Sequence, residues 1–389
     1  MAAFVAAMVV LAFNLRGAIT SLPPLFPELS SSLHLSSAEI AVLAATPVVC
    51  FGLFSGVAAP LSRRHGEERV LLAALVLLTV GLLCRTALPG WLLFPGTVLA
   101  SAAIALMNVL LPSLVKRRQP DRAGLLIGVY LLSLAAGAIL GSLIAVPLFQ
   151  ASGGSVPLAL GIWAAPAAAA VLVWLPQWRF RTAPAGALLP GQRGLLKVSR
   201  HALAWQVMGF MGLQSLIYYA TLSWLPTLFR DRGAAPEHAG TLLALMNLGN
   251  AVTALLIPML AHRTRDQRRL VAAMVAVSAV GLAGAWFAPL AGAAAWVLLL
   301  GLGQGAALGL AIYFTMARAP DPVSSASLSA FAQGAGYLVA ATGPLAVAFL
   351  HTATGGWTVP VVTLLVVMAA ELVTGWQAGR AVTLPAGPA

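Results

Sequence analysis

Long apolar stretches recur along the whole sequence of 389 residues. Each stretch is about twenty residues long, which is enough to cross the roughly 30 Å hydrocarbon core of a bilayer as a helix. Sixty per cent of the residues are hydrophobic and only 8% are charged. This composition excludes an ordinary water-soluble domain. The sequence therefore predicts an all-α polytopic membrane protein that lies in a lipid bilayer.

Twelve transmembrane helices are predicted from the apolar stretches. We expect them at residues 4–25, 38–61, 70–88, 91–115, 122–149, 157–176, 202–229, 238–261, 270–288, 291–317, 323–350 and 358–379. The first stretch has no basic segment before it and no small-residue cleavage site after it. We therefore interpret it as a retained helix and not as a removable signal peptide.

The formal net charge of +12 comes from Lys and Arg residues spread over short loops, which argues against a nucleic-acid partner. If both termini are cytoplasmic, 18 of these 22 residues lie on the inner side. The outer loops then hold only Arg85, Arg230 and Arg232, while Arg16 falls within a span. Because the positive-inside rule predicts such an excess, we expect both termini in the cytoplasm.

Three short sequence matches recur in order between the two parts of the chain. They are "LPPLF" at 22–26 with "LPTLF" at 225–229, "RRQPD" at 117–121 with "ARAPD" at 317–321, and "AAGA" at 135–138 with "AQGA" at 332–335. The offsets of 203, 200 and 197 residues predict that spans one to six are duplicated as spans seven to twelve. We expect six-helix halves at 1–176 and 202–389, joined by a cytoplasmic linker at 177–201 that is rich in proline, glycine and basic residues.

Two pseudo-symmetric six-helix halves with inside termini resemble the major facilitator superfamily. Four segments are similar to the cyanate and 2-nitroimidazole porter family within it: "NLRGAITSLPPL", "SRRHGEERVLLAALVLLTVGLLCR", "NVLLPSLVKRRQPDRAGLLIGVY" and "WLPQ". This chain departs from that family at Gly17, where a proline commonly follows the arginine of span one. The resemblance implies a secondary transporter of small, often anionic or nitrogen-rich solutes, in the bacterial cytoplasmic (inner) membrane.

Arg16 is a permanent cation within the first span. It lies twelve residues after Phe4, or about 18 Å along the helix, near the middle of the bilayer. Burial of arginine at that depth costs roughly 2.5–3.5 kcal/mol, so such residues usually face a wet cavity or a partner. Glu371 is the only acidic residue that lies within the predicted spans and not at a span end or in a loop, and the resemblance implies that its span is peripheral. We therefore expect an anionic or electron-rich ligand at Arg16; the alternative is a structural role, with Arg16 bound to carbonyls and water.

The resemblance implies that spans one, four, seven and ten line the central cavity, which makes their polar residues the next candidates. On these spans the candidates are Thr20, Asn108, Gln214, Tyr218, Tyr219, Thr221 and Gln304; spans eight and eleven add Asn247, Asn250, Gln333 and Tyr337. Helical spacing puts several of them on one face. For each residue alone, an interhelical hydrogen bond is the alternative to ligand contact.

Enzymatic chemistry finds no support in the sequence, because the six histidines show no metal-ligand spacing and no phosphate-binding loop pattern occurs. We expect no cofactor, no metal and a monomer. No carboxylate is visible in the expected cavity, which favours uniport or exchange, with proton coupling through Glu371 as the alternative. Two other functions stay open: a proton-coupled exporter of neutral amphipathic compounds, and a membrane receptor or lipid-handling protein without transport.

Overall fold

The computed structural model describes residues 2–86, 90–179 and 197–385. These residues form helices and no strand, which confirms the predicted all-α class. They divide into two compact units. The first unit combines the described residues before 186 with Leu222–Ala244, and the second combines those from 197 to 221 with Leu245 onward.

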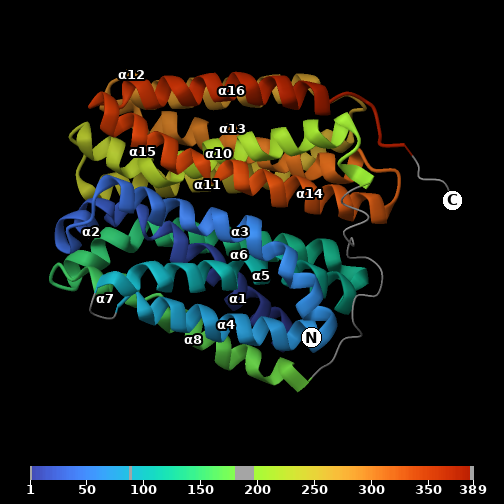
Figure 1. Ribbon diagram of the computed structural model, residues 1–389, viewed down its shortest axis with the longest axis horizontal. Coiled ribbons are helices and arrows are strands. Elements are labelled where there is room, and N and C mark those ends of the chain that lie inside the picture. The colour runs from blue at the N-terminus through green and yellow to red at the C-terminus, as the bar shows by residue number, and fades with distance from the viewer. Residues whose placement is uncertain (1, 87–89, 180–196, 386–389) are drawn as a thin grey trace. The chain divides into compact units, whose positions relative to one another are not determined.

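The first unit is built from long helices that run back and forth. They are α1 (Ala2–Thr20), α3 (Ser37–His65), α4 (Glu67–Cys84), α5 (Leu93–Arg118), α6 (Ala123–Ala151) and α8 (Ala164–Trp174), with the short α2 (Phe26–Leu33) and α7 (Val156–Gly161) between them. Helix α1 packs against α6 and α8, while α5 packs against α3 and α4 (Figure 1). The outer parts of α10 (Ala202–Asp231) and α11 (Pro236–His262) complete this unit.

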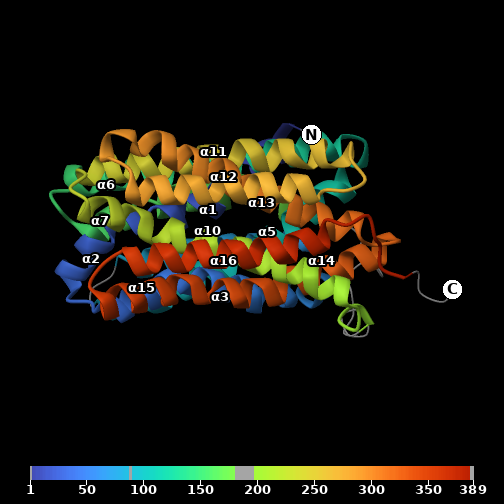
Figure 2. The same ribbon diagram turned by 90° about the horizontal axis from the view of Figure 1, so that it is seen from above.

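The second unit contains the remaining parts of α10 and α11 and five further helices. These are α12 (Arg268–Phe287), α13 (Ala293–Ala317), α14 (Pro322–Ala340), α15 (Thr342–Thr354) and α16 (Thr358–Ala378). Helix α12 packs along both α13 and α16 (Figure 2). The predicted span at 323–350 is thus two helices, α14 and α15, which meet at Ala341.

Local sequence explains where several helices begin and end. The hydroxyl of Ser36 accepts a hydrogen bond from the Glu39 N–H, and the Glu39 carboxylate accepts one from the Ser36 N–H, so α3 begins at a capping box. Helix α1 ends before Pro23 and Pro24, which have no N–H to continue its hydrogen bonds. At the far end of α10, Arg230 donates to both carboxylate oxygens of Glu28 in α2, at 2.7 and 2.9 Å.

The predicted repeat recurs in the packing of neighbouring helices. A Cβ atom on Gly81 of α4 would lie 2.7 Å from the Ala100 nitrogen and 2.8 Å from the Gly96 oxygen in α5. Two hundred residues later, a Cβ atom on Gly281 of α12 would lie 2.4 Å from the Leu300 nitrogen in α13. Each helix pair is therefore held together by a close backbone approach that only glycine allows.

Ten helical segments of the described chain are long and apolar enough to cross a membrane by length and composition. Two of the twelve predicted spans, α4 and α10, are helical but fall outside this set. Three charged residues begin α4, and polar side chains occupy the middle of α10. Residues 180–196 of the expected linker lie outside the described residues, so the division into halves at 176 and 202 stays a prediction.

Candidate functional site

Arg16 lies half-buried in α1, within the first unit. Helix α1 packs closely against α6, which carries Tyr130. The Tyr130 hydroxyl in turn donates a hydrogen bond to the Asn108 side-chain oxygen of α5, at 3.3 Å. The phenol and the amide thus meet between α6 and α5, and the guanidinium lies on α1, which packs against α6; we call Arg16, Asn108 and Tyr130 the Arg16 group.

Asn108 was predicted from the sequence, but Tyr130 was not. Sequence reasoning considered the spans that line the cavity in the resembled superfamily, and Tyr130 lies on span five. The small residues of span five, which pack closely against span one, were the signal that could have indicated Tyr130. A Cβ atom on Gly137 of α6 would lie only 2.1 Å from the Phe13 oxygen of α1, so the two backbones are in direct contact.

The residue after Arg16 is glycine for a visible packing reason. A Cβ atom on Gly17 would lie 2.5 Å from a ring carbon of Trp163, which is itself buried. The Trp163 ring also packs against Phe13, with 6.3 Å between ring centroids. The proline that is common in the resembled family would meet this ring, so Gly17 and Trp163 form a matched pair beside Arg16.

The Thr20 side chain links α1 to α6 by a hydrogen bond. Its hydroxyl is fully buried and donates to the Ala138 oxygen of α6 at 3.0 Å, and it also lies 3.1 Å from the Arg16 oxygen. Asn14 has a comparable role on the other side of α1, where its amide donates to the Pro166 oxygen at 3.1 Å. These contacts fix α1 between its neighbours and leave Thr20 outside the Arg16 group.

In the second unit, α10 carries the centre of another polar cluster. The Tyr218 hydroxyl donates to the Asn247 side-chain oxygen of α11 at 3.1 Å, and the Gln304 amide of α13 donates to the Thr221 hydroxyl at 3.1 Å. The Tyr219 ring packs against the rings of both Tyr218 and Tyr337, with centroid distances of 5.2 and 6.4 Å. We call these residues the α10 polar group: Tyr218, Tyr219, Thr221, Asn247, Gln304 and Tyr337.

Three predicted site residues lie apart from the hydrogen bonds of the α10 polar group. The buried Gln214 amide donates to the Ser215 hydroxyl at 2.6 Å, beside the Met211 sulfur. Gln333 donates to Ser329 in its own helix at 2.8 Å. Asn250 lies half-buried one turn beyond Asn247.

Glu371 is 3% exposed and lies in α16, which packs against α12. Among the described residues its carboxylate has no hydrogen-bond or ion-pair partner. It belongs to the second unit, whereas Arg16 belongs to the first. No group of three or more His, Cys, Asp or Glu side chains within the described part of the chain could hold a metal ion.

Several charged residues that we expected in loops are buried at helix ends. Arg85 is buried where α4 ends, and Glu67 and Glu68 are buried where it begins. Glu67 pairs with Arg117 of α5 and Glu68 with Arg118, the latter at 3.2 Å. Burial raises the pKa of Glu67, against the opposing effects of Arg117 and Ser113.

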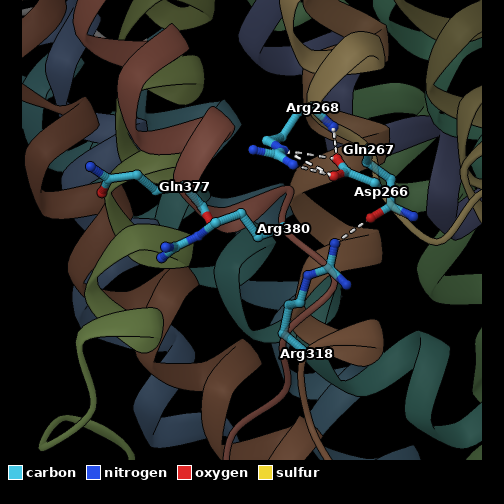
Figure 3. Close-up of polar contacts among 6 residues, drawn as sticks. All are labelled: Asp266, Gln267, Arg268, Arg318, Gln377 and Arg380. Carbon is cyan, nitrogen blue, oxygen red and sulfur yellow. Dashed lines mark hydrogen bonds and ion pairs between the residues drawn. The ribbon is translucent and has the colours of Figure 1, made fainter.

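The second unit has a buried arginine at the corresponding helix end. The Arg318 guanidinium points toward Gln267 and hydrogen-bonds its side-chain oxygen, next to the ion pair of Asp266 with Arg268 (Figure 3). Arg318 also donates to the Ala378 oxygen at 2.8 Å. These contacts fasten the ends of α12, α13 and α16 to one another.

Comparison with known proteins gives consistent matches over most of the chain. The family model described as Major Facilitator Superfamily matches residues 3–344. A 2-nitroimidazole transporter of Escherichia coli is 39% identical over 378 residues, which cover 97% of this chain and 95% of that protein. A cyanate transport protein of the same organism is 30% identical over 351 residues, which cover 90% of each chain.

A similar fold occurs among solved structures. A bacterial homolog of the human lysosomal transporter Spinster, in an inward-facing and unoccupied conformation, superposes with a TM-score of 0.78. The match covers 97% of this chain and 96% of that chain at 13% sequence identity. At that identity the likeness concerns the fold alone.

Proposed function

Because the chain belongs to the Major Facilitator Superfamily, we propose that it moves a small anionic or nitrogen-rich organic solute across the bacterial cytoplasmic membrane, with Arg16 in the substrate site. The family makes the chain a multi-pass membrane transporter of a small solute and not an enzyme. The choice of solute class and the role of Arg16 are our inference.

The observation that carries the proposal is the Arg16 group. A guanidinium offers several N–H donors in a fixed plane, which suits carboxylate, nitro and other electron-rich acceptors. Asn108 and Tyr130 add an amide and a hydroxyl beside it. Cyanate and 2-nitroimidazole, which appear in the names of two relatives, are both small and rich in nitrogen and oxygen acceptors.

The α10 polar group, within the second unit, is our second candidate for residues that contact the solute. Its members come from α10, α11, α13 and α14, and hydrogen bonds or ring contacts join them. Aromatic rings next to a few amides suit a flat heterocycle. Gln214, Asn250 and Gln333 have supporting positions in this proposal, since they lie on α10, α11 and α14, and Thr20 has one beside Arg16 on α1.

We infer uniport or exchange by alternating access, in a monomer with both termini in the cytoplasm. A second candidate is proton-coupled export of neutral amphipathic compounds, and the buried Glu371 carboxylate is the observation that favours it. Glu371→Gln separates the two, because it should leave flux intact under the first function. Loss of pH-dependent transport in a folded Glu371→Gln variant would support the second.

The test of Arg16 uses purified protein with sodium cyanate and 2-nitroimidazole as probes. Binding is read as a rise in melting temperature and flux as uptake into proteoliposomes. We expect Arg16→Lys to weaken binding, because lysine keeps the charge but loses the planar fork, and Arg16→Met to abolish it nearly completely. Arg64→Met is the control, since Arg64 is an exposed arginine.

Two results would contradict the proposal. A stable Arg16→Met variant with unchanged probe affinity would remove Arg16 from the site. Binding of either probe without any flux would instead indicate a receptor.

A further inference from the structure

Arg85 is an arginine buried inside the first unit with 5% of its surface exposed. We propose that Arg85 is a positioning residue for substrate recognition: it holds the end of α1 and thereby keeps Arg16 in place beside Asn108 and Tyr130. The proposal rests on the function inferred above for Arg16. It goes beyond that function because Arg85 acts through α1 and not by touching the solute.

The contacts of Arg85 join three helices. From the end of α4, its Nη1 donates to the Ala18 oxygen of α1 at 2.9 Å, and its Nε donates to the Thr97 hydroxyl of α5 at 3.2 Å. The Thr97 hydroxyl donates its own hydrogen bond to the Leu93 oxygen at 2.7 Å, which leaves its lone pairs to accept from Arg85. Helix α1 packs along α6 and α8 but touches α5 only briefly. Arg85 therefore supplies a link between α1 and α5 where packing supplies little.

The end of α1 leaves the Ala18 oxygen without its usual helical donor. In a continuing helix the Leu22 N–H would bond to the Ala18 oxygen, but here it bonds to the Ile19 oxygen at 3.3 Å. Apart from the Ser21 hydroxyl at 3.4 Å, the Arg85 guanidinium is the donor to Ala18. A cation at a helix C-terminus also interacts favourably with the helix dipole. The held carbonyl is two residues from Arg16, within the same turn.

The second unit builds the same helix junction without an arginine. At the offset of 200 residues given by Gly81 and Gly281, Arg85 corresponds to Ala285 and Thr97 to Val297, and both of these residues are buried and apolar. Its counterpart of α1, the helix α10, continues without a break to Asp231. The packing of α4 on α5 therefore does not require a buried charge. The broken end of α1 does, which ties Arg85 to the helix that carries Arg16.

The charge of Arg85 is expensive to retain for packing alone. Its Nη2 is buried and has no hydrogen-bond partner in the described part of the chain, and a buried polar atom without a partner costs free energy. A neutral residue of similar length would fill the same volume without this cost. The hydrogen bonds of Arg85 to Ala18 and Thr97 therefore explain this arginine better than its packing does.

The decisive experiment is a double-mutant cycle in binding of the two probes, cyanate and 2-nitroimidazole. If Arg85 acts through Arg16, Arg85→Met should raise the probe Kd about tenfold in the wild-type background but add little to Arg16→Lys, because the two residues are coupled. Independent roles would multiply the two losses, and that outcome would overturn the proposal. Arg318→Met is the matched control: Arg318 is also buried and donates to a backbone carbonyl at 2.8 Å, but in the second unit. It should lower stability and leave probe affinity unchanged.

A second measurement needs no solute. Amide hydrogen exchange of residues 17–22 should quicken in Arg85→Met and stay unchanged in Arg318→Met. Unchanged exchange in Arg85→Met would overturn the proposal even if neither probe bound to the wild type, in which case the proposed function alone would fail. Should Arg85→Met not fold, Arg85→Lys and Thr97→Val remove one donor or one acceptor each and should show smaller effects of the same kind.

Discussion

One arginine at a helix end of each unit, Arg118 in the first and the buried Arg318 in the second, binds neighbouring helices, and the two are 200 residues apart in the sequence. In the first unit, Arg118 pairs with Glu68 at 3.2 Å and hydrogen-bonds the Gln177 oxygen at 2.7 Å. In the second, Arg318 binds the neutral Gln267 and the Ala378 oxygen (Figure 3). Each guanidinium also lies over a phenylalanine ring, Phe4 at 5.0 Å or Phe314 at 5.1 Å. Phe4 lies in α1, whereas Phe314 of α13 lies one turn before Arg318, so both the rings and the acceptors differ between the units.

The change in acceptors follows from a few positions in the repeat. Glu67 and Glu68 begin α4, whereas Gln267 and Arg268 stand at the corresponding positions before and within α12. The first unit thus relies on buried ion pairs and the second on neutral hydrogen bonds. The comparison teaches that a guanidinium at this helix end can be bound by a carboxylate, as at Arg118, or by a neutral amide, as at Arg318.

The largest expected effect comes from removing each arginine in turn. Arg118→Met leaves the buried Glu68 carboxylate without its cation, which should cost about 3–5 kcal/mol of unfolding free energy. Arg318→Met leaves only neutral acceptors without that donor, which should cost about 1–3 kcal/mol. Melting temperatures of both variants, measured in the same detergent, test whether Arg118→Met loses more stability than Arg318→Met. Equal losses would break the distinction between an ionic and a neutral cluster.

A smaller effect is expected from placing a carboxylate next to Arg318, as Glu68 lies next to Arg118. Gln267 accepts from Arg318, but its amide also donates to the oxygens of Ala261 and Thr264. In Gln267→Glu the carboxylate could not donate to the Ala261 and Thr264 oxygens, because it has no proton. We expect a loss of about 2 kcal/mol despite the new ion pair with Arg318. Because protonation restores a donor, the loss should shrink at low pH; a gain in stability at neutral pH would contradict this reasoning.

The sequence predicted the helices well, because they depend on apolar patterns that extend over many residues, while the duplication of the two halves stays a prediction. Helical spacing on α10 likewise indicated Tyr218 and Thr221, which share a face and take part in one polar group. Spacing gives the face of a helix but not the distance to the next helix. That is why the sequence did not indicate the bond of Thr20 to Ala138 or that of Tyr130 to Asn108. Contact of Thr20 with a ligand stays a prediction.

Charged residues at span ends were the least predictable. Hydropathy places Arg85, Glu67 and Glu68 at the ends of apolar stretches, where solvent exposure is the ordinary expectation. Their burial depends on partners far along the chain, such as Ala18 for Arg85 and Arg118 for Glu68. A sequence pattern that is read one helix at a time does not contain these pairings.

The smallest effect concerns the exposed ion pair that lies beside Arg318. Arg268 holds the pKa of Asp266 at about 2, below its ordinary value of 3.8. A carboxyl whose pKa is lowered in the folded state stabilises that state above pH 3.8, and this contribution is lost as the pH falls toward 2. Both side chains are more than a third exposed, at 39% and 42%, so solvent and salt weaken the pair. We therefore expect Asp266→Asn to melt slightly below the wild type at pH 5–7, with the difference closing between about pH 4 and 2. Melting temperatures across that range test the sign. If the melting temperatures of the wild type and Asp266→Asn differ equally at pH 7 and at pH 2.5, Asp266 contributes through the hydrogen bond that it accepts from the Arg268 N–H and not through its charge. The ion pair beside Arg318 would then add nothing measurable to stability.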